Sequence, residues 1–237
     1  ANKLIHKDNV LAILGPTMSS EMFAIGPMVN QEGVPIMGTS LTVEGITEIG
    51  DYVFRNSLPE SAAIPQSIKR AKAKYNLKKV AIMYSDNNDL AVSGHKTIKQ
   101  TLKAEGIEVL GVETFADKNT DFSAQLTKIA TLKPDAIMVA GLYQEAALIL
   151  KKARELGINV PVVGNNGFNS PQLIKSAGAA ADGAVVASPW FPGKEDPKVK
   201  KFIADYKAKY NKEPDQFAAQ AYDALQIMAI ALEKSGS

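Results

Sequence analysis

Residues 11–20 have the sequence Leu11-Ala12-Ile13-Leu14-Gly15-Pro16-Thr17-Met18-Ser19-Ser20, and an apolar-patterned run over residues 21–29 follows. A short apolar run that ends at Gly-Pro and continues into small hydroxyl residues is typical of a buried strand, a loop and a helix start. Ser19 or Ser20 is expected at the helix N-cap, where unpaired backbone N–H groups and the helix dipole favour a bound carboxylate. The alternative is that the serine only caps its own helix.

The same alternation of a short apolar run and a helical pattern recurs along the chain. Strands are predicted over residues 10–14, 34–37, 52–55, 80–84, 108–114, 136–140, 161–163 and 183–187. Between them, apolar residues recur at helical spacing; one stripe runs from Ala146 to Leu156, and Gly157 is expected to stop that helix. The alternation predicts right-handed βαβ units, and therefore an α/β fold with mostly parallel sheets and helices on both faces.

Two places interrupt this pattern. Ser57-Leu58-Pro59 precedes a second βαβ series that begins at residues 80–84, so a domain division is predicted there. After Trp190, Pro192-Gly193 ends the strand region, and two helices follow, the second over about residues 216–234.

The composition excludes several classes of function. The 237 residues include 27 basic and 25 acidic side chains, a net charge of +2, so no nucleic-acid partner is expected. The absence of cysteine excludes disulfides, thiolate chemistry and cysteine-bound metals.

Enzyme motifs are weak. The sequence has neither a Gly-x-Gly-x-x-Gly fingerprint nor a Gly-x-Ser-x-Gly elbow. Its two histidines, His6 and His95, lie on Lys-rich segments and are expected on the solvated surface. We therefore predict that the chain is not an enzyme, with no catalytic residue, no cofactor and no metal.

Loops that follow the predicted strands carry small, hydroxyl or aromatic residues. Examples are Thr17-Met18-Ser19-Ser20, Gly38-Thr39-Ser40-Leu41-Thr42, Gly141-Leu142-Tyr143 and Gly164-Asn165-Asn166-Gly167-Phe168-Asn169. Ligands of open parallel sheets bind outside the carboxyl ends of the strands. Neutral hydrogen-bonding groups beside apolar surface favour a binding pocket over a reaction centre. For any single loop, these residue types are also explained by turn formation alone.

At these residues the sequence resembles the branched-chain amino acid (Leu/Ile/Val) binding proteins of bacterial ABC importers, which have the type I periplasmic solute-binding fold. The resemblance covers nearly the whole chain. Its markers are Ile13-Leu14-Gly15-Pro16 with Ser19, Val34-Pro35-Ile36 with Gly38-Thr39-Ser40, Thr120-Asp121-Phe122-Ser123, Lys133-Pro134-Asp135-Ala136 and residues 164–168.

The resemblance implies two doubly wound α/β lobes with a ligand between them. The first lobe would hold the ligand carboxylate, and help to hold an amino group, through Ser19, Ser40, Leu41 and Thr42. The second lobe would contribute Leu90, Tyr143 and Asn166, with Phe168 as an apolar wall. Closure of the lobes by a hinge motion would let the protein dock on an ABC permease in the membrane.

Two positions depart from the pattern of the family: the position of Leu90 is commonly aromatic, and Asn166 is the second. Amino acid binders resembling this chain usually carry an acid where Asn166 stands, and that acid neutralises the ligand ammonium. Glu145 is a candidate replacement, although its place on the helix after Tyr143 suggests that it points to solvent. The ligand is therefore expected to be a small amino acid or, alternatively, an aromatic or aliphatic carboxylate without an amino group. A ligand-sensing domain of a receptor or regulator is a further alternative.

The resemblance also implies that segments of the family before Ala1 and beyond Ser237 are missing, which would leave the first lobe incomplete. Residues 1–58 would form part of lobe 1 and residues 59–195 lobe 2. Residues 196–237 would form helices at the end of lobe 2 that return to lobe 1. A periplasmic or extracellular membrane-anchored location is implied.

Overall fold

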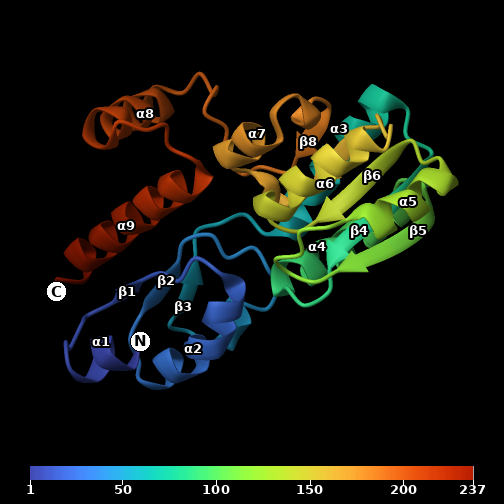
Figure 1. Cartoon of the computed structure of the whole chain (residues 1–237). Coiled ribbons are helices and arrows are strands. Elements are labelled where there is room, and N and C mark those ends of the chain that lie inside the picture. Colours follow the sequence, from blue (N-terminus) through green and yellow to red (C-terminus); the bar gives the residue numbers. More distant parts are fainter. Residues whose placement is uncertain (237) are drawn as a thin grey trace. The chain divides into compact units, whose positions relative to one another are not determined.

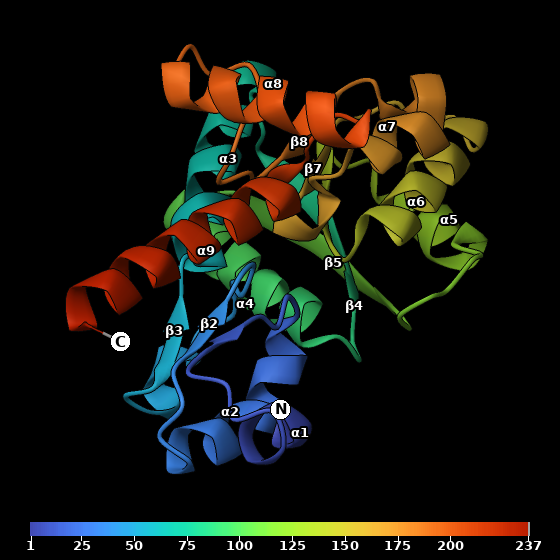
Figure 2. The ribbon, with the colours of Figure 1, turned by 90° about the vertical axis from the view of Figure 1, so that its left-hand side faces the viewer.

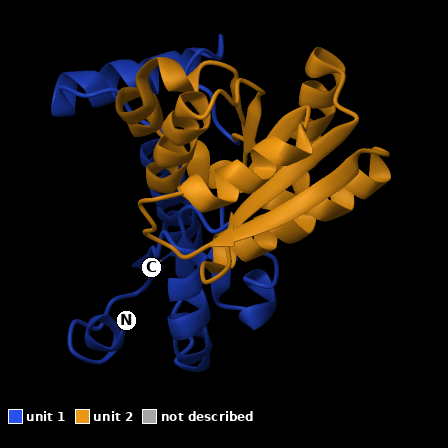
Figure 3. Ribbon diagram, turned by 45° about the vertical axis from the view of Figure 1, so that its right-hand side comes forward, with its two compact units in different colours: residues 1–59, 189–237 blue, residues 60–188 orange. Residues whose placement is uncertain are grey.

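The computed structural model describes residues 1–236, which fall into two units built on separate parallel sheets (Figure 3). Unit 1 contains Ala1–Pro59 and the chain from Pro189 onward, and unit 2 contains Glu60–Ser188. Both units have an α/β architecture.

Unit 1 is built on a three-stranded parallel sheet in the order β1-β2-β3 (Figure 1). Its elements are α1 (Asn2–His6), β1 (Ile13–Leu14), α2 (Ser19–Gln31), β2 (Ile36–Gly38), η1 (Thr47–Ile49), β3 (Val53–Arg55), α8 (Pro197–Tyr210) and α9 (Gln216–Ser235). Ile36 pairs with Ile13 on one side and with Val53 on the other, and all three side chains belong to one buried cluster. This sheet has fewer strands than the five-stranded sheet of unit 2.

Helix α9 contacts strands β1 and β2 of this sheet (Figure 2). An apolar hollow of about 320 Å³ remains between them, and Leu11, Phe54 and Ile227 contribute to its wall. Leu11 is 68% exposed and Phe54 is 45% exposed. Part of the apolar surface of this sheet is therefore in contact with solvent.

Unit 2 is built on a five-stranded parallel sheet in the order β5-β4-β6-β7-β8. Its elements are α3 (Glu60–Tyr75), β4 (Lys79–Ser85), α4 (Asp89–Ala104), β5 (Glu108–Phe115), α5 (Ser123–Leu132), β6 (Ala136–Ala140), α6 (Tyr143–Glu155), β7 (Val162–Gly164), η2 (Asn166–Phe168), α7 (Pro171–Ala177), η3 (Gly178–Ala181) and β8 (Ala184–Val186). This strand order is that of a doubly wound sheet, which presents its loops at the carboxyl ends of the strands.

Helices cover both faces of the second sheet because successive strand residues point to opposite sides. Val80 and Ile82 of β4 pack with α3 and α4, whereas Ala81 and Met83 pack with α5 and α6. Burial on both faces explains why β6 is continuously apolar rather than alternating.

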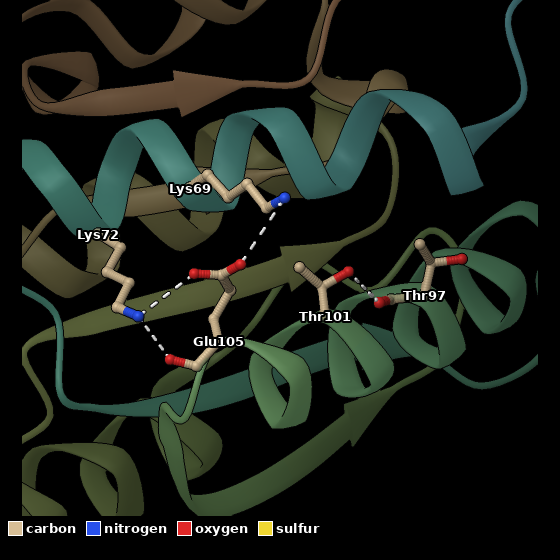
Figure 4. A network of polar contacts seen from close by, with 5 residues as sticks. All are labelled: Lys69, Lys72, Thr97, Thr101 and Glu105. Atoms are coloured by element: carbon tan, nitrogen blue, oxygen red, sulfur yellow. Dashed lines mark hydrogen bonds and ion pairs between the residues drawn. The ribbon is translucent and has the colours of Figure 1, made fainter.

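Polar contacts tie helix α3 to the end of α4 (Figure 4). Lys72 Nζ donates to the backbone oxygen of Glu105 at 2.5 Å and to its Oε2 at 3.2 Å. Lys69 Nζ lies 3.9 Å from the other carboxylate oxygen of Glu105. Within α4, Thr101 Oγ1 donates to the carbonyl oxygen of Thr97 at 2.8 Å.

All eight predicted strands are present; the strand over residues 136–140 has the predicted bounds, and the ends of the others are shifted. The largest difference is in the first strand, which was expected over residues 10–14 and contains only Ile13–Leu14. Only these two residues have partners on β2, since Ile13 pairs with Ile36 and Leu14 with Met37.

The second unit ends earlier than the predicted boundary between residues 195 and 196. The structure divides the chain after Ser188 and assigns both following helices to unit 1. The Trp190 ring packs edge-on against Phe202 of α8, with the two ring centroids 6.3 Å apart. The ring centroids of Phe202 and Tyr222 of α9 are 5.1 Å apart. These aromatic contacts join the segment after β8 to the two helices.

Candidate functional site

Two loops meet at the carboxyl edge of the sheet in unit 1. Because β1 and β2 are parallel neighbours, the segments that follow them emerge at the same edge. The hydroxyls of Thr17 and Thr39 lie 3.1 Å apart, and the Thr39 N–H donates to the Pro16 oxygen at 3.0 Å. The structure therefore brings the Ser19 loop and the Ser40–Thr42 loop together.

Helix α2 begins one residue earlier than a serine cap requires. The N-cap is Met18, whose backbone N–H donates to Glu21 Oε2 at 3.1 Å, so Ser19 is the first helical residue. The predicted capping by Ser19 or Ser20 is therefore wrong. The N–H groups of the first turn still have no partner inside the helix, which preserves the anion-binding character of this end.

The loop after β2 carries buried hydroxyls. Thr42 is 1% exposed and Ser40 is 8% exposed. Within residues 1–236, neither Ser40 Oγ nor Thr42 Oγ1 has a hydrogen-bond partner. An unsatisfied buried hydroxyl is costly, so each such atom calls for an explanation such as a ligand or water.

Leu41, between these two residues, has a different role. Its side chain is fully buried in the apolar cluster of unit 1. A Cβ atom at Gly38 would lie 2.0 Å from Leu41 Cδ1, so the leucine turns back over the end of β2. Any contact of Leu41 with a ligand would come from its backbone.

Three loops meet at the carboxyl edge of the sheet in unit 2. The Gly141 N–H, after β6, donates to Asn165 Oδ1, after β7, at 3.2 Å. A Cβ atom at Gly167 would lie 2.2 Å from the Gly141 oxygen and 3.2 Å from Leu90 Cδ2. The close approach of these backbones places the segments that carry Leu90, Tyr143 and Asn166 side by side.

The predicted residues of unit 2 differ in burial. Leu90 and Tyr143 are half-buried, at the starts of α4 and α6. Asn166 is 3% exposed, in η2. Phe168 is fully buried and belongs to the core cluster beside α6 and α7. The Phe168 ring therefore packs in the core under η2, the segment that also carries Asn166.

Glu60 is an acid of this region that the sequence did not reveal. It opens α3, is 1% exposed, and its Oε1 accepts from Asn165 Nδ2 at 2.8 Å and from the Asn166 N–H at 3.3 Å. Burial raises its pKa from 4.5 to about 7, although the two hydrogen bonds act in the opposite direction. In the sequence, Glu60 looks like an ordinary acid in the first turn of a helix.

Glu145 does not point to solvent, contrary to the prediction. It is 3% exposed, and its Oε1 accepts from the Lys118 N–H at 2.9 Å. This hydrogen bond anchors the turn after β5 to helix α6. Glu145 is therefore tied to a neighbouring loop of the same unit.

His95 is not a solvated surface histidine. Its ring stacks on the ring of Tyr84, with the two ring centroids 4.0 Å apart and an interplanar angle of 12°. Burial lowers the pKa of His95, and the nearby charge of Lys99 lowers it further. Stacking on Tyr84 accounts for the position of the His95 ring on α4.

Over residues 1–236, no group of three or more His, Cys, Asp or Glu side chains is arranged to hold a metal ion. In the same range, no helix has the length and apolar character that crossing a membrane requires.

A family model described as periplasmic binding protein matches residues 1–237. A solved leucine-binding protein of Thermotoga maritima is 31% identical, with a TM-score of 0.93 over 100% of this chain and 67% of that chain. A branched-chain amino acid substrate-binding protein of Streptococcus pneumoniae, solved with isoleucine, is 34% identical, with a TM-score of 0.89 over 97% of this chain and 66% of that chain.

A relative solved with a different type of ligand is also similar. The solute-binding protein of an ABC transporter of Rhodopseudomonas palustris, in complex with 3,4-dihydroxybenzoic acid, is 27% identical. Its TM-score is 0.89 over 99% of this chain and 65% of that chain. The chain spans 63–64% of the length of the first curated relatives that it matches.

Proposed function

Because the chain belongs to the periplasmic binding protein family, in its type I Leu/Ile/Val-binding class, we propose that it is the solute-binding component of an ABC importer. This is a family of binding proteins rather than enzymes. We propose that the protein captures a small amino acid of the branched-chain class, or a related carboxylate, between its two lobes. It would act outside the cytoplasm, periplasmic or anchored to the outer side of the membrane, and deliver the ligand to an ABC permease.

The observation that carries this proposal is the polar edge of unit 1. Within the described residues, Ser40 Oγ and Thr42 Oγ1 are buried hydroxyls without partners, beside the start of α2. Hydroxyl donors together with free backbone N–H groups are the chemistry that holds a carboxylate. We propose Ser19, Ser40 and Thr42 as the carboxylate site, with Leu41 contributing through its backbone.

The second lobe would supply the wall around the ligand side chain. Leu90 and Tyr143 are half-buried and belong to loops that meet at one sheet edge, which supports a role for both in the pocket. Asn166 would contact the polar part of the ligand. Phe168 would support the pocket through its position in the core.

A specific observation favours a second candidate function. Asn166 carries no charge, and a relative 27% identical was solved with 3,4-dihydroxybenzoic acid. An aromatic or aliphatic carboxylate without an amino group is therefore the second candidate ligand. A ligand-sensing domain of a receptor or regulator would use the same pocket.

A thermal-shift panel tests the proposal. The panel contains L-leucine, L-isoleucine and L-valine, then benzoate and 3,4-dihydroxybenzoate, then 4-methylpentanoate as an aliphatic acid. A ligand at one hundred times its Kd stabilises the native state by about 2.7 kcal/mol, which raises the melting temperature by several degrees. A shift with the amino acids supports the first function, and a shift with the acids alone supports the second. No shift with any of these ligands contradicts both.

A further inference from the structure

Glu60 is a buried acid of unit 2 to which the site proposed above gives no role. It is the first residue of α3, and its Oε1 accepts from Asn165 Nδ2 at 2.8 Å and from the Asn166 N–H at 3.3 Å. Both donors belong to the segment that follows β7. One carboxyl oxygen of α3 therefore fixes the segment that carries Asn166.

Asn165 extends this restraint to a second loop. The residue is fully buried, and its Oδ1 accepts from the Gly141 N–H at 3.2 Å. A backbone N–H can only donate, which places Oδ1 on the side of Gly141 and Nδ2 on the side of Glu60. Glu60 therefore also holds the loop after β6, which continues into Tyr143, through the Asn165 amide.

Helix α4 lies against the same pair of side chains. A Cβ atom at Gly94 would be 2.9 Å from Glu60 Oε2 and 3.3 Å from Asn165 Nδ2, so the missing side chain makes room for both groups. Within residues 1–236, Oε2 has no hydrogen-bond partner, and the restraining contacts are those of Oε1. Gly94 and Leu90 are four residues apart, on one face of the helix. The pair therefore contacts all three segments that carry the proposed pocket residues of unit 2.

We propose that Glu60 is a positioning residue of the ligand pocket, which holds the loops after β6 and β7 in the arrangement that binds ligand. This inference rests on the proposed function and applies equally to an amino acid and to a carboxylate without an amino group. Glu60 would act through the two loops rather than by touching the ligand. Buried hydrogen bonds that hold a loop in its bound arrangement reduce the cost of ordering that loop on binding.

Replacing the acceptor tests this role. Glu60→Met removes both oxygens at nearly constant length, whereas Glu60→Gln keeps an oxygen that can accept from Asn165. Calorimetry uses the compound of the thermal-shift panel that stabilises the wild type most, which is expected to be L-leucine. Glu60→Met should lower the affinity by about 10–100-fold, and Glu60→Gln should recover most of it.

Asp135→Leu is the matched control. Asp135 lies just before β6, at the opposite end of the strand from Gly141. Its Oδ2 accepts from the Lys78 N–H at 2.9 Å and from the Lys79 N–H at 3.0 Å, so it too is one carboxyl oxygen shared by two N–H donors. Asp135→Leu should lower the melting temperature and leave the affinity unchanged.

Amide hydrogen exchange gives a readout that needs no ligand. Glu60→Met should accelerate exchange at the Gly141 and Asn166 N–H groups and leave the two N–H groups bonded to Asp135 unchanged. Asp135→Leu should do the reverse. A role in stability alone would not produce this reciprocal pattern.

Three outcomes overturn the inference while the proposed function stands. The first is a Glu60→Met variant that binds as tightly as the wild type. The second is an equal loss of affinity in Glu60→Met and Asp135→Leu, which would mean that both act through stability alone. The third is a Glu60→Gln variant that binds as weakly as Glu60→Met, because its acceptor oxygen is retained.

Asn165→Ala decides if Glu60→Met does not fold. It breaks the link to Gly141 and leaves the bond from the Asn166 N–H to Glu60. Exchange at the Gly141 N–H should then accelerate and the affinity should fall; no change in either would overturn the inference. If the wild type binds no compound of the panel, the proposed function fails, and the positioning role fails with it.

Discussion

The ring of Phe168 occupies the space in which a side chain on Gly164 would have to lie. A Cβ atom at Gly164 would be 2.0 Å from Phe168 Cδ2, a distance that atoms in contact do not reach. Leu41 and Gly38 have the same relationship in unit 1, also at 2.0 Å. In both units, a glycine that ends a strand lets an apolar residue of the next loop fold back into the core.

Gly164→Ala should destabilise the protein. The new methyl group forces Phe168 out of its position, and overpacking of this kind costs roughly 1–3 kcal/mol or more. Neither Gly164 nor Gly38 has a positive φ, so backbone strain does not contribute. Urea unfolding measures the loss, and Gly38→Ala should behave in the same way. Phe168→Leu in the Gly164→Ala background should recover part of the loss; a purely additive double variant would contradict this explanation.

Glu60→Gln should change how stability depends on pH. The folded pKa of Glu60 is about 7 against an ordinary 4.5, so the folded state holds this proton longer than the unfolded state. The free energy of unfolding of the wild type therefore falls as pH rises from about 4.5 to about 7, by about 3 kcal/mol from this group. Glutamine removes that contribution while its oxygen still accepts from Asn165. Urea unfolding at pH 4.5, 6 and 7.5 should show the variant gaining stability over the wild type as pH rises, and a constant difference would contradict the prediction.

Thr42→Val should have opposite effects on stability and on binding. Removing an unsatisfied buried hydroxyl leaves the unliganded protein equally stable or slightly more stable. The affinity for the ligand carboxylate should fall by about 1–3 kcal/mol, and Ser19→Ala should weaken binding by a similar amount. Calorimetry and thermal unfolding separate the two effects.

Thr101→Val provides the control for Thr42→Val. Thr101 Oγ1 donates to the Thr97 oxygen at 2.8 Å inside α4, so the substitution should lower stability and leave affinity unchanged. Unchanged affinity in both Thr42→Val and Ser19→Ala would remove these residues from the site.

Asn166→Asp should improve the binding of α-amino acids relative to carboxylates without an amino group. The new carboxylate would attract a ligand ammonium and repel a ligand that has only negative charge. The ratio of the affinities for L-leucine and 4-methylpentanoate is the measurement. An unchanged ratio would mean that residue 166 lies away from the polar part of the ligand.

The positions of strands and helices were largely predictable, because alternation of apolar runs and helical stripes is a local property of the sequence. The loops after β1 and β2 were also predictable as neighbours, since parallel strands place their carboxyl ends at one edge. The start of α2 was not, because a hydrogen bond from Met18 to Glu21 fixes it rather than a serine side chain. The predictions for Glu145 and His95 were wrong for a similar reason: Glu145 is buried and accepts from the Lys118 N–H, and half-buried His95 stacks on the ring of Tyr84.

The sequence by itself determined the α/β class, the family and the loops that carry the polar residues, because these depend on residue type and spacing along the chain. Only the tertiary structure decided which polar atoms lack partners and which acid is buried. Asn56 and Gln220 are 164 residues apart, and their hydrogen bond exists only because folding brings β3 and α9 together. The pKa of Glu60 likewise depends on the loss of water around it, which no neighbour in the sequence can signal.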